Sequence, residues 1–201
     1  MDNICVIPNA NTFSTHQTAA LNARRVIAIG RYNYQKGFDR LIKAWKTVNQ
    51  VCPEWTLDII GEGEDKARLQ SLINYEKLNG SVRLMPATSD IENVYLGASV
   101  VAMSSHYEGL PMVLLEAQSF GLPIVAFACQ CGPKDVITDG ETGFLVPEGE
   151  VEGLADRLIT VMEDDNLRLS MGKKAKEASH RYEERGVMQL WMETFQTVME
   201  Q

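Results

Sequence analysis

Apolar residues follow two alternating patterns along the chain. Short continuous apolar runs end at Gly, Pro or polar residues and fit strands buried on both faces; they cover residues 26–30, 55–61, 82–85, 98–103, 123–127 and 143–146. Between these runs, apolar residues recur at helical spacing, as Phe38, Leu41 and Trp45 do. Strands that alternate with helices predict an α/β fold, a doubly wound and mostly parallel six-stranded sheet with helices on both faces.

The two ends of the chain depart from this alternation. Residues 4–7 read as a short apolar strand, and a polar Pro/Asn/Thr/Ser loop follows it up to residue 23. We interpret residues 1–23 as a strand and linker between domains, residues 24–180 as one domain, and residues 181–201 as a C-terminal helix. A strand fragment followed by a linker leads us to expect that the chain is part of a longer protein.

Composition narrows the class of protein. The chain is 45% hydrophobic and 23% charged, as globular domains are, and its net charge of −8 argues against a nucleic-acid surface, which needs a basic stripe. No apolar run approaches the roughly 20 residues of a membrane span. The cysteines form no C-x-x-C pair, so we favour small core residues over a redox or metal feature at Cys129 and Cys131. This cysteine usage fits a cytoplasmic protein.

The most informative stretch joins the fourth apolar run to the next helix. Parallel sheets bind ligands outside the carboxyl ends of their strands, and this stretch lies at such an end. Pro111 suits the first helical position, and free N–H groups there carry partial positive charge that favours anions. Glu108 and Glu116 flank this turn, and carboxylates accept pairs of hydroxyl hydrogens, as in sugar or ribose diols. The alternative is that Glu108 balances the helix dipole and Glu116 is solvated.

The loop after the first strand supplies positive charge. Arg31 and Lys36 follow Gly30 closely, and the two cations suit a diphosphate, although two solvated loop residues are the alternative. Gly61-x-Gly63 lacks the third glycine of a dinucleotide fingerprint and is followed by acidic residues, so we reject a nicotinamide or flavin site. The loop at 131–143 is either part of a phosphate cradle or a connector. No metal-binding spacing appears, and His106 stays unassigned.

Taken together, these motifs resemble the retaining glycosyltransferases of family four, which have the GT-B architecture. The similarity rests on Gly30-Arg31 followed by Lys36-Gly37, on Glu108 and Glu116 eight residues apart, and on the Gly132-Pro133 segment with the Gly143–Val146 run. It extends over essentially the whole chain. It implies that residues 24–180 form the C-terminal, donor-binding domain of a two-lobed enzyme.

The resemblance also implies roles for single residues. Arg31 and Lys36 would neutralise the donor diphosphate, Glu108 would hold the transferred sugar, and Glu116 would hold the ribose hydroxyls. We thus expect Glu108, Arg31 and Lys36 to take part in catalysis. The expected donor-binding residues are these three and Gly30, Gly61, Met85, Pro86, Gly109, Leu110, Pro111, Met112, Val113 and Glu116. Met85 and Pro86 would flank the base beside Gly61, although Pro86 stands where the family commonly has Gly.

The implied function is retaining transfer from a nucleotide-diphospho-sugar, expected to be a UDP-hexose, to a glycan or lipid-linked acceptor. No metal or other cofactor is implied, because Arg31, Lys36 and the helix dipole stabilise the departing diphosphate. The acceptor and any peripheral membrane contact would belong to an N-terminal lobe, so we expect no turnover by this chain alone. A GT-B epimerase, a phosphorylase and a non-catalytic nucleotide-binding module are the alternatives.

Overall fold

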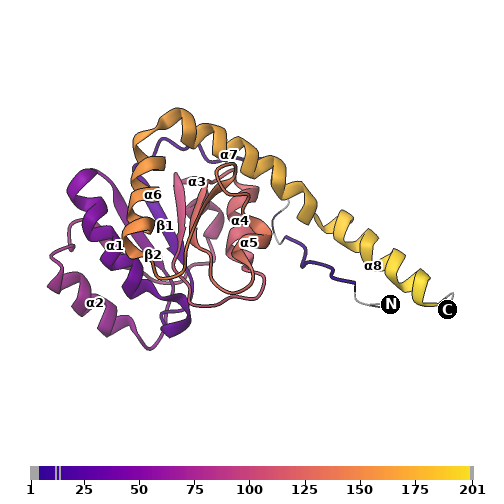
Figure 1. Cartoon of the computed structure of the whole chain (residues 1–201), viewed down its shortest axis with the longest axis horizontal. Coiled ribbons are helices and arrows are strands. Elements are labelled where there is room, and N and C mark those ends of the chain that lie inside the picture. Colours follow the sequence, from indigo (N-terminus) through magenta and orange to yellow (C-terminus); the bar gives the residue numbers. More distant parts are fainter. Residues whose placement is uncertain (1–4, 12, 14, 200–201) are drawn as a thin grey trace.

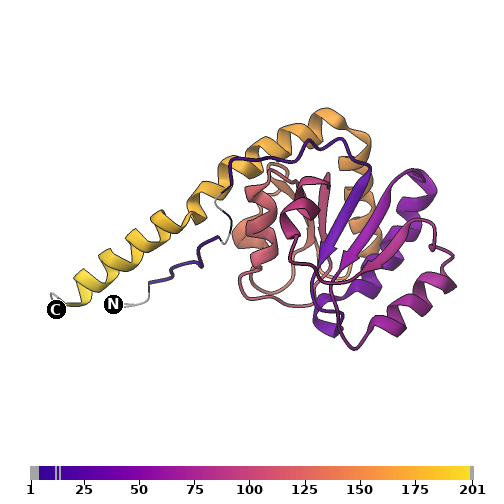
Figure 2. The ribbon, with the colours of Figure 1, turned by 180° about the vertical axis from the view of Figure 1, so that it is seen from behind.

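The structure is a computed structural model that describes residues 5–11, 13 and 15–199. Parallel strands form a six-stranded sheet in the order β3-β2-β1-β4-β5-β6 (Figures 1 and 2). They are β1 Arg25–Ile29, β2 Thr56–Ile60, β3 Val82–Met85, β4 Val100–Met103, β5 Ile124–Phe127 and β6 Gly143–Val146. The predicted doubly wound α/β fold is confirmed, with each strand inside its predicted run or within one residue of it.

Helices cover both faces of the sheet (Figure 1). One face carries α1 (Phe38–Val51), α2 (Lys66–Tyr75) and α6 (Val151–Glu163), and the other carries α3 (Ile91–Leu96), α4 (Met112–Ser119) and α5 (Pro133–Val136). Helix α7 (Asp165–Ser179) crosses the amino-terminal end of the sheet and packs on α4 and α6. After the short turn η2 (His180–Tyr182), α8 (Glu184–Met199) extends away from the domain.

Burial on both faces explains the continuous apolar runs. Along β5, Val125 and Phe127 point into the core beneath α1 and α6, whereas Ile124 and Ala126 point into the core beneath α4. Side chains of a strand alternate between the two faces of its sheet, so a strand covered on both sides has no polar face. The pattern that predicted the strands therefore follows from the two helical layers.

Asp58 breaks this apolar pattern in the middle of β2. Its side chain is 1% exposed, and its carboxylate accepts hydrogen bonds from Arg25 Nε at 2.7 Å and Arg83 Nε at 2.6 Å. The two arginines come from β1 and β3, the strands on either side. A buried carboxylate is stable only when paired in this way, and here the pairing ties three adjacent strands together.

The N-terminal segment differs from its prediction. Residues 5–7 form no strand, and residue 4 of the predicted strand lies outside the described residues. A strand needs a neighbour to satisfy its backbone N–H and C=O groups, and this segment runs instead beside α8, where Cys5 Sγ lies 3.6 Å from Thr194 Oγ1 (Figure 2). Helix α4 also begins one residue later than predicted, with Pro111 as its N-cap.

The predicted linker packs against the domain instead of standing away from it. Asn11 Nδ2 donates to Leu115 O at 3.0 Å, and Ala19 N donates to Phe120 O at 2.8 Å. Lys176 of α7 donates to Thr15 O at 2.6 Å. The segment therefore lies along the ends of α4 and α7, and the proposed domain boundaries at residues 23 and 180 stay predictions.

Candidate functional site

The candidate site lies where the winding of the sheet reverses. β1 and β4 are neighbours although β2 and β3 come between them in sequence, and their following helices, α1 and α4, cover opposite faces. In sheets of this type the loops after two such strands diverge, and ligands usually bind between them at the carboxyl edge. Both motifs singled out in the sequence follow these two strands.

Close backbone contacts hold the loops of this edge together. A Cβ atom at Gly61, after β2, would collide with the carbonyl oxygen of Gly30, after β1. A Cβ at Gly132, where φ is +83°, would collide with the carbonyl oxygen of Gly109 in the turn after β4. These two positions require glycine because another backbone occupies the space of a side chain. The loops after β1 and β2 thus form one unit, and those after β4 and β5 another.

Tyr32 anchors the loop after β1. Its buried hydroxyl lies 2.8 Å from Ile59 O and 2.6 Å from Met85 O, so the loop is tied to β2 and β3. Burial raises the pKa of Tyr32 to about 12, so the phenol stays protonated at neutral pH. The loop then closes with the 3₁₀ turn η1 (Tyr34–Lys36), capped by Asn33 Oδ1, which accepts from Lys36 N at 3.2 Å.

Lys36 and Glu108 form an ion pair that joins the loop after β1 to the turn after β4. Lys36 Nζ lies 2.7 Å from Glu108 Oε1, and the two side chains are only 17% and 6% exposed. Ser105 Oγ donates to the same oxygen at 2.6 Å. A buried carboxylate with two donors is held in one orientation. The structure therefore brings the predicted phosphate-binding lysine and the predicted sugar-binding glutamate into direct contact.

Arg40 clamps the loop after β1 to the end of β4. Its Nη2 donates to Ser104 O at 2.6 Å, and its guanidinium lies 4.7 Å above the ring of Phe127. Ser104 Oγ in turn donates to Lys36 O at 2.9 Å. Burial and the charge of Arg40 lower the pKa of nearby His106, so its imidazole is neutral at pH 7. Arg40 therefore positions the backbone that carries Lys36.

Glu116 lies on α4, with its carboxylate held by the neighbouring helix. Tyr95 of α3 donates from Oη to Glu116 Oε2 at 2.6 Å. The phenol is fully buried, and burial together with the charge of Glu116 raises its pKa well above the usual 10. Glu116 as a residue is half-buried on α4.

The other predicted residues spread along the same edge. Arg31 is exposed, as are Gly109 and the pair Met85 and Pro86 at the end of β3. Leu110, Met112 and Val113 are half-buried, whereas Pro111 is buried. Because β3 and β4 are separated by two strands, Met85 and Pro86 stand apart from Glu108, in line with an elongated ligand rather than a compact one.

Ser105, Arg40 and Tyr95 were missed by the sequence analysis. Ser105 lies three residues before Glu108, so its proximity to the turn was a usable signal. Arg40 is separated by 64 residues from the carbonyl that it binds, and Tyr95 by 21 residues from Glu116. No local pattern predicts such contacts, because they depend on which strands and helices become neighbours.

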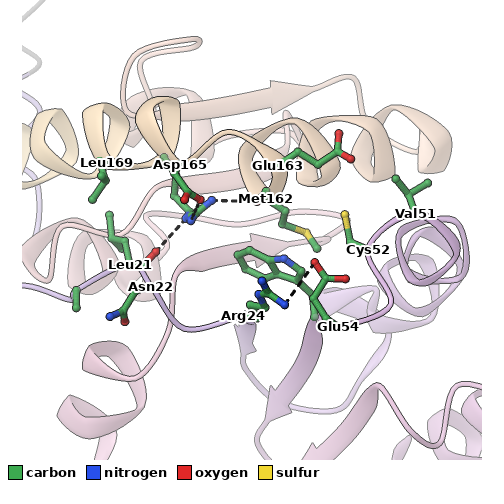
Figure 3. Close-up of a pocket in the computed structure, with 13 residues that line it drawn as sticks. Leu21, Asn22, Arg24, Val51, Cys52, Glu54, Met162, Glu163, Asp165 and Leu169 are labelled. Atoms are coloured by element: carbon green, nitrogen blue, oxygen red, sulfur yellow. Dashed lines mark hydrogen bonds and ion pairs between the residues drawn. The ribbon is translucent and has the colours of Figure 1, made fainter.

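A pocket of about 530 Å³ lies at the opposite, amino-terminal end of the sheet (Figure 3). Arg168, 5% exposed, donates there to the carbonyl oxygens of Leu21, Val161 and Met162, each at 3.0 Å. These contacts close the end of α6 and fix the segment before β1. The side chains around this pocket therefore hold α6 to the segment before β1, and the pocket is remote from Lys36 and Glu108.

A second pocket, of about 620 Å³, adjoins the turn after β4 at Gly109 and Leu110 and is bordered by Arg181 and residues 6–9.

Over the described part of the chain, no three His, Cys, Asp or Glu side chains gather as a metal site would require. Within those same residues, no helix is both long and apolar enough to span a membrane.

Comparisons with known proteins give matches over most of the chain. Residues 11–178 match the family model described as "Glycosyl transferases group 1". The chain is 34% identical over 191 residues to an uncharacterized glycosyltransferase of Haemophilus influenzae, covering 94% of this chain and 54% of the relative. It is 34% identical over 200 residues to the amylovoran biosynthesis glycosyltransferase AmsD of Erwinia amylovora, covering 95% and 55%.

Solved structures show the same fold. S. aureus TarM, in a complex with fondaparinux, alpha-GlcNAc-glycerol and UDP, is 27% identical and aligns with a TM-score of 0.83 over 96% of this chain and 38% of its own. The chain thus spans about half the length of the two sequence relatives and less of this structural one.

Proposed function

The chain belongs to the glycosyl transferases group 1 family, and from that premise we propose that it holds a nucleotide-diphospho-sugar along the carboxyl edge of its sheet. The contact between Lys36 and Glu108 carries the proposal. It places a phosphate-binding cation beside a hydroxyl acceptor at the point where the winding reverses. A diphosphate joined to a sugar presents these two chemistries side by side.

Lys36 is placed to bind the diphosphate. Its ammonium group lies beside Glu108, on a loop fixed by Tyr32, Asn33 and Arg40. Arg31, exposed on the same loop, adds a planar guanidinium that suits a phosphate. The N–H groups of Gly109, Leu110, Met112 and Val113 lie at the start of α4, where the helix dipole favours negative charge. These groups together neutralise the leaving diphosphate without a divalent cation.

Glu108 and Glu116 divide the hydroxyl groups of the donor between them. Glu108 Oε1 is occupied by Lys36 and Ser105, which orients the carboxylate so that its other lone pairs serve sugar hydroxyls. Glu116, further along α4, serves the ribose. Gly61, Met85 and Pro86 then flank the base at the β2 and β3 end of the edge. The presence of UDP in the TarM complex supports uracil as the base.

Transfer itself needs more than this chain. We assign the acceptor, a glycan or lipid-linked molecule, to a second lobe, with retention at the anomeric carbon as the family resemblance implies. The enzyme is proposed to work in the cytoplasm, with any membrane contact through that lobe. The exposed apolar face of α8, which includes Trp191 and Phe195, is proposed to pack towards it.

Calorimetry of the chain against UDP-, GDP- and ADP-sugars tests the proposal. We expect UDP compounds to bind best, and Lys36→Met or Glu116→Gln to weaken UDP binding by about tenfold, as the loss of one charge-assisted contact implies. Lys43→Met, at an exposed lysine of α1, is the matched control and should leave the affinity unchanged.

Unchanged UDP affinity in both site variants would show that the site is assigned wrongly. The isolated chain should also show no sugar transfer to any acceptor. Detectable transfer would contradict the assignment of the acceptor to a second lobe.

A further inference from the structure

Tyr95 is a buried phenol whose hydroxyl group meets the site. It belongs to α3, its side chain is fully buried, and its Oη lies 2.6 Å from Glu116 Oε2. Burial, and then the charge of Glu116, raise the pKa of Tyr95 well above its usual value of 10, so the hydroxyl keeps its proton at neutral pH. The phenol therefore donates its hydroxyl hydrogen to the carboxylate of Glu116.

The ring of Tyr95 has little freedom to move. It stacks on Phe120 at a centroid distance of 5.1 Å and an interplanar angle of 14°, and it meets the edge of Phe13 at 6.3 Å. Phe120 is the C-cap residue of α4, the helix that carries Glu116. The Tyr95 ring is therefore packed against the same helix as the carboxylate that its hydroxyl group contacts. A phenol held in this way presents its hydroxyl at one fixed point.

We propose that Tyr95 is a positioning residue that orients the Glu116 carboxylate toward the two hydroxyl groups of the nucleotide ribose. The inference rests on the proposed function, in which Glu116 binds that ribose. A carboxylate accepts a bidentate pair of hydroxyl groups only when its plane is set correctly. Tyr95, together with the other contacts of Glu116, sets that plane by occupying one lone pair of Oε2. The pair thereby gives preference for a ribonucleotide over a nucleotide that lacks these hydroxyls.

The test compares UDP with 2′,3′-dideoxyuridine diphosphate by calorimetry. The wild-type chain should prefer UDP by roughly tenfold, the value of the hydrogen bonds that the dideoxy compound cannot make. Tyr95→Phe removes one hydroxyl and keeps the aromatic stack. It should weaken UDP binding by roughly three- to tenfold and leave dideoxy-UDP binding unchanged, so that the preference falls toward one.

Tyr182→Phe is the matched control, because Tyr182 is also buried and its hydroxyl donates to Asp135 O at 2.9 Å. Both variants should melt at a slightly lower temperature, but only Tyr95→Phe should lose the preference for ribose.

A retained preference in Tyr95→Phe, or an equal loss of affinity for both nucleotides, would overturn the role of Tyr95 alone. A wild-type chain that binds UDP without preferring it would overturn the ribose role of Glu116 and this inference with it. A wild-type chain that binds neither nucleotide would overturn the proposed function, and the role of Tyr95 would fall with it.

Discussion

At the scale of single residues, the two charged side chains of the candidate site, Lys36 and Glu108, bind each other. Lys36 and Glu108 neutralise each other at 2.7 Å, and Ser105 adds a second donor to the carboxylate. A diphosphate that binds Lys36 must share the ammonium group with Glu108, whose negative charge also repels the phosphate oxygens. In the proposed site, this carboxylate favours the sugar hydroxyls and disfavours the phosphate. We therefore expect Glu108 to act in opposite directions on the sugar and on the diphosphate of a donor.

Replacing Glu108 by Gln should separate these two effects. Without the negative charge, Lys36 becomes fully available, so we expect UDP to bind about threefold more tightly. A UDP-hexose should gain less or bind more weakly, because the amide is a poorer acceptor of sugar hydroxyls than a carboxylate. Calorimetry with both ligands measures the difference. Glu152→Gln, at an exposed position on α6, is the control, and an equal change for both ligands would contradict the sugar role of Glu108.

At the scale of elements, the site depends on how one loop is fastened to one strand end. Arg40 on α1 binds Ser104 O, and Ser104 Oγ binds Lys36 O, so α1, β4 and the loop between β1 and α1 form a closed ring of contacts. Gly37 makes the close approach possible, since its φ is +57° and a Cβ there would collide with Ser104 O. The position of Lys36 therefore depends on α1, on the end of β4 and on the loop between β1 and α1.

Arg40→Met should remove the hydrogen bond between α1 and Ser104 O, and the pKa of His106 should show the loss of the nearby charge. Burial and the charge of Arg40 lower the pKa of the His106 imidazole, so removal of that charge should raise the pKa toward the usual value near 6.5. NMR titration of the histidine ring signals measures the shift. We also expect UDP affinity to fall a few-fold, by roughly the free energy of one charge-assisted hydrogen bond.

Lys43→Met provides the matched loss of a cation on α1, at an exposed position. It should leave both the pKa of His106 and the affinity for UDP where they are. If Arg40→Met left the pKa of His106 unchanged, the proximity of the two groups would not hold in solution.

At the scale of the whole molecule, α8 stands apart from the domain (Figures 1 and 2). Of its described apolar side chains, Val187 is buried, whereas Trp191 is 41% exposed and Phe195 58% exposed. The two aromatic rings stack on each other at 5.6 Å. Their exposure means that the domain gains little stability from them. This is the expected property of a surface that packs on another body.

A pair of variants tests this view of α8. Trp191→Ser with Phe195→Ser should change the free energy of unfolding of the chain by no more than about 0.5 kcal/mol, as for other exposed positions. Val187→Ala should cost about 1 kcal/mol or more, because Val187 is buried against the domain. Urea denaturation measures both. A loss in the aromatic double variant as large as that of Val187→Ala would show that α8 packs on its own domain.

Much of the fold was readable from local patterns. Each strand of the sheet coincides with an apolar run or lies within one residue of it. Burial on both faces explains this for the central strands β1, β2, β4 and β5, whereas the edge strand β3 keeps Arg83 and Met85 exposed. The N-terminal strand was wrong because an apolar run at residues 5–7 says nothing about whether a pairing neighbour exists. Lys36 and Glu108 were both named from sequence, but their contact was not, since 72 residues separate them.

The sequence by itself determined the fold class, because periodicity and Gly/Pro turns are local properties of the chain. Its motifs also resembled the family that the comparisons show, and the site residues that they suggest, such as Lys36, Glu108 and Glu116, stay predictions. The tertiary structure alone decided that Lys36 pairs with Glu108, that Arg40 holds the loop of Lys36 to β4, and that Tyr95 donates to Glu116. These contacts arise where the strand order places β1 beside β4 and packs α3 against α4. They depend on distances between elements, which no local pattern encodes.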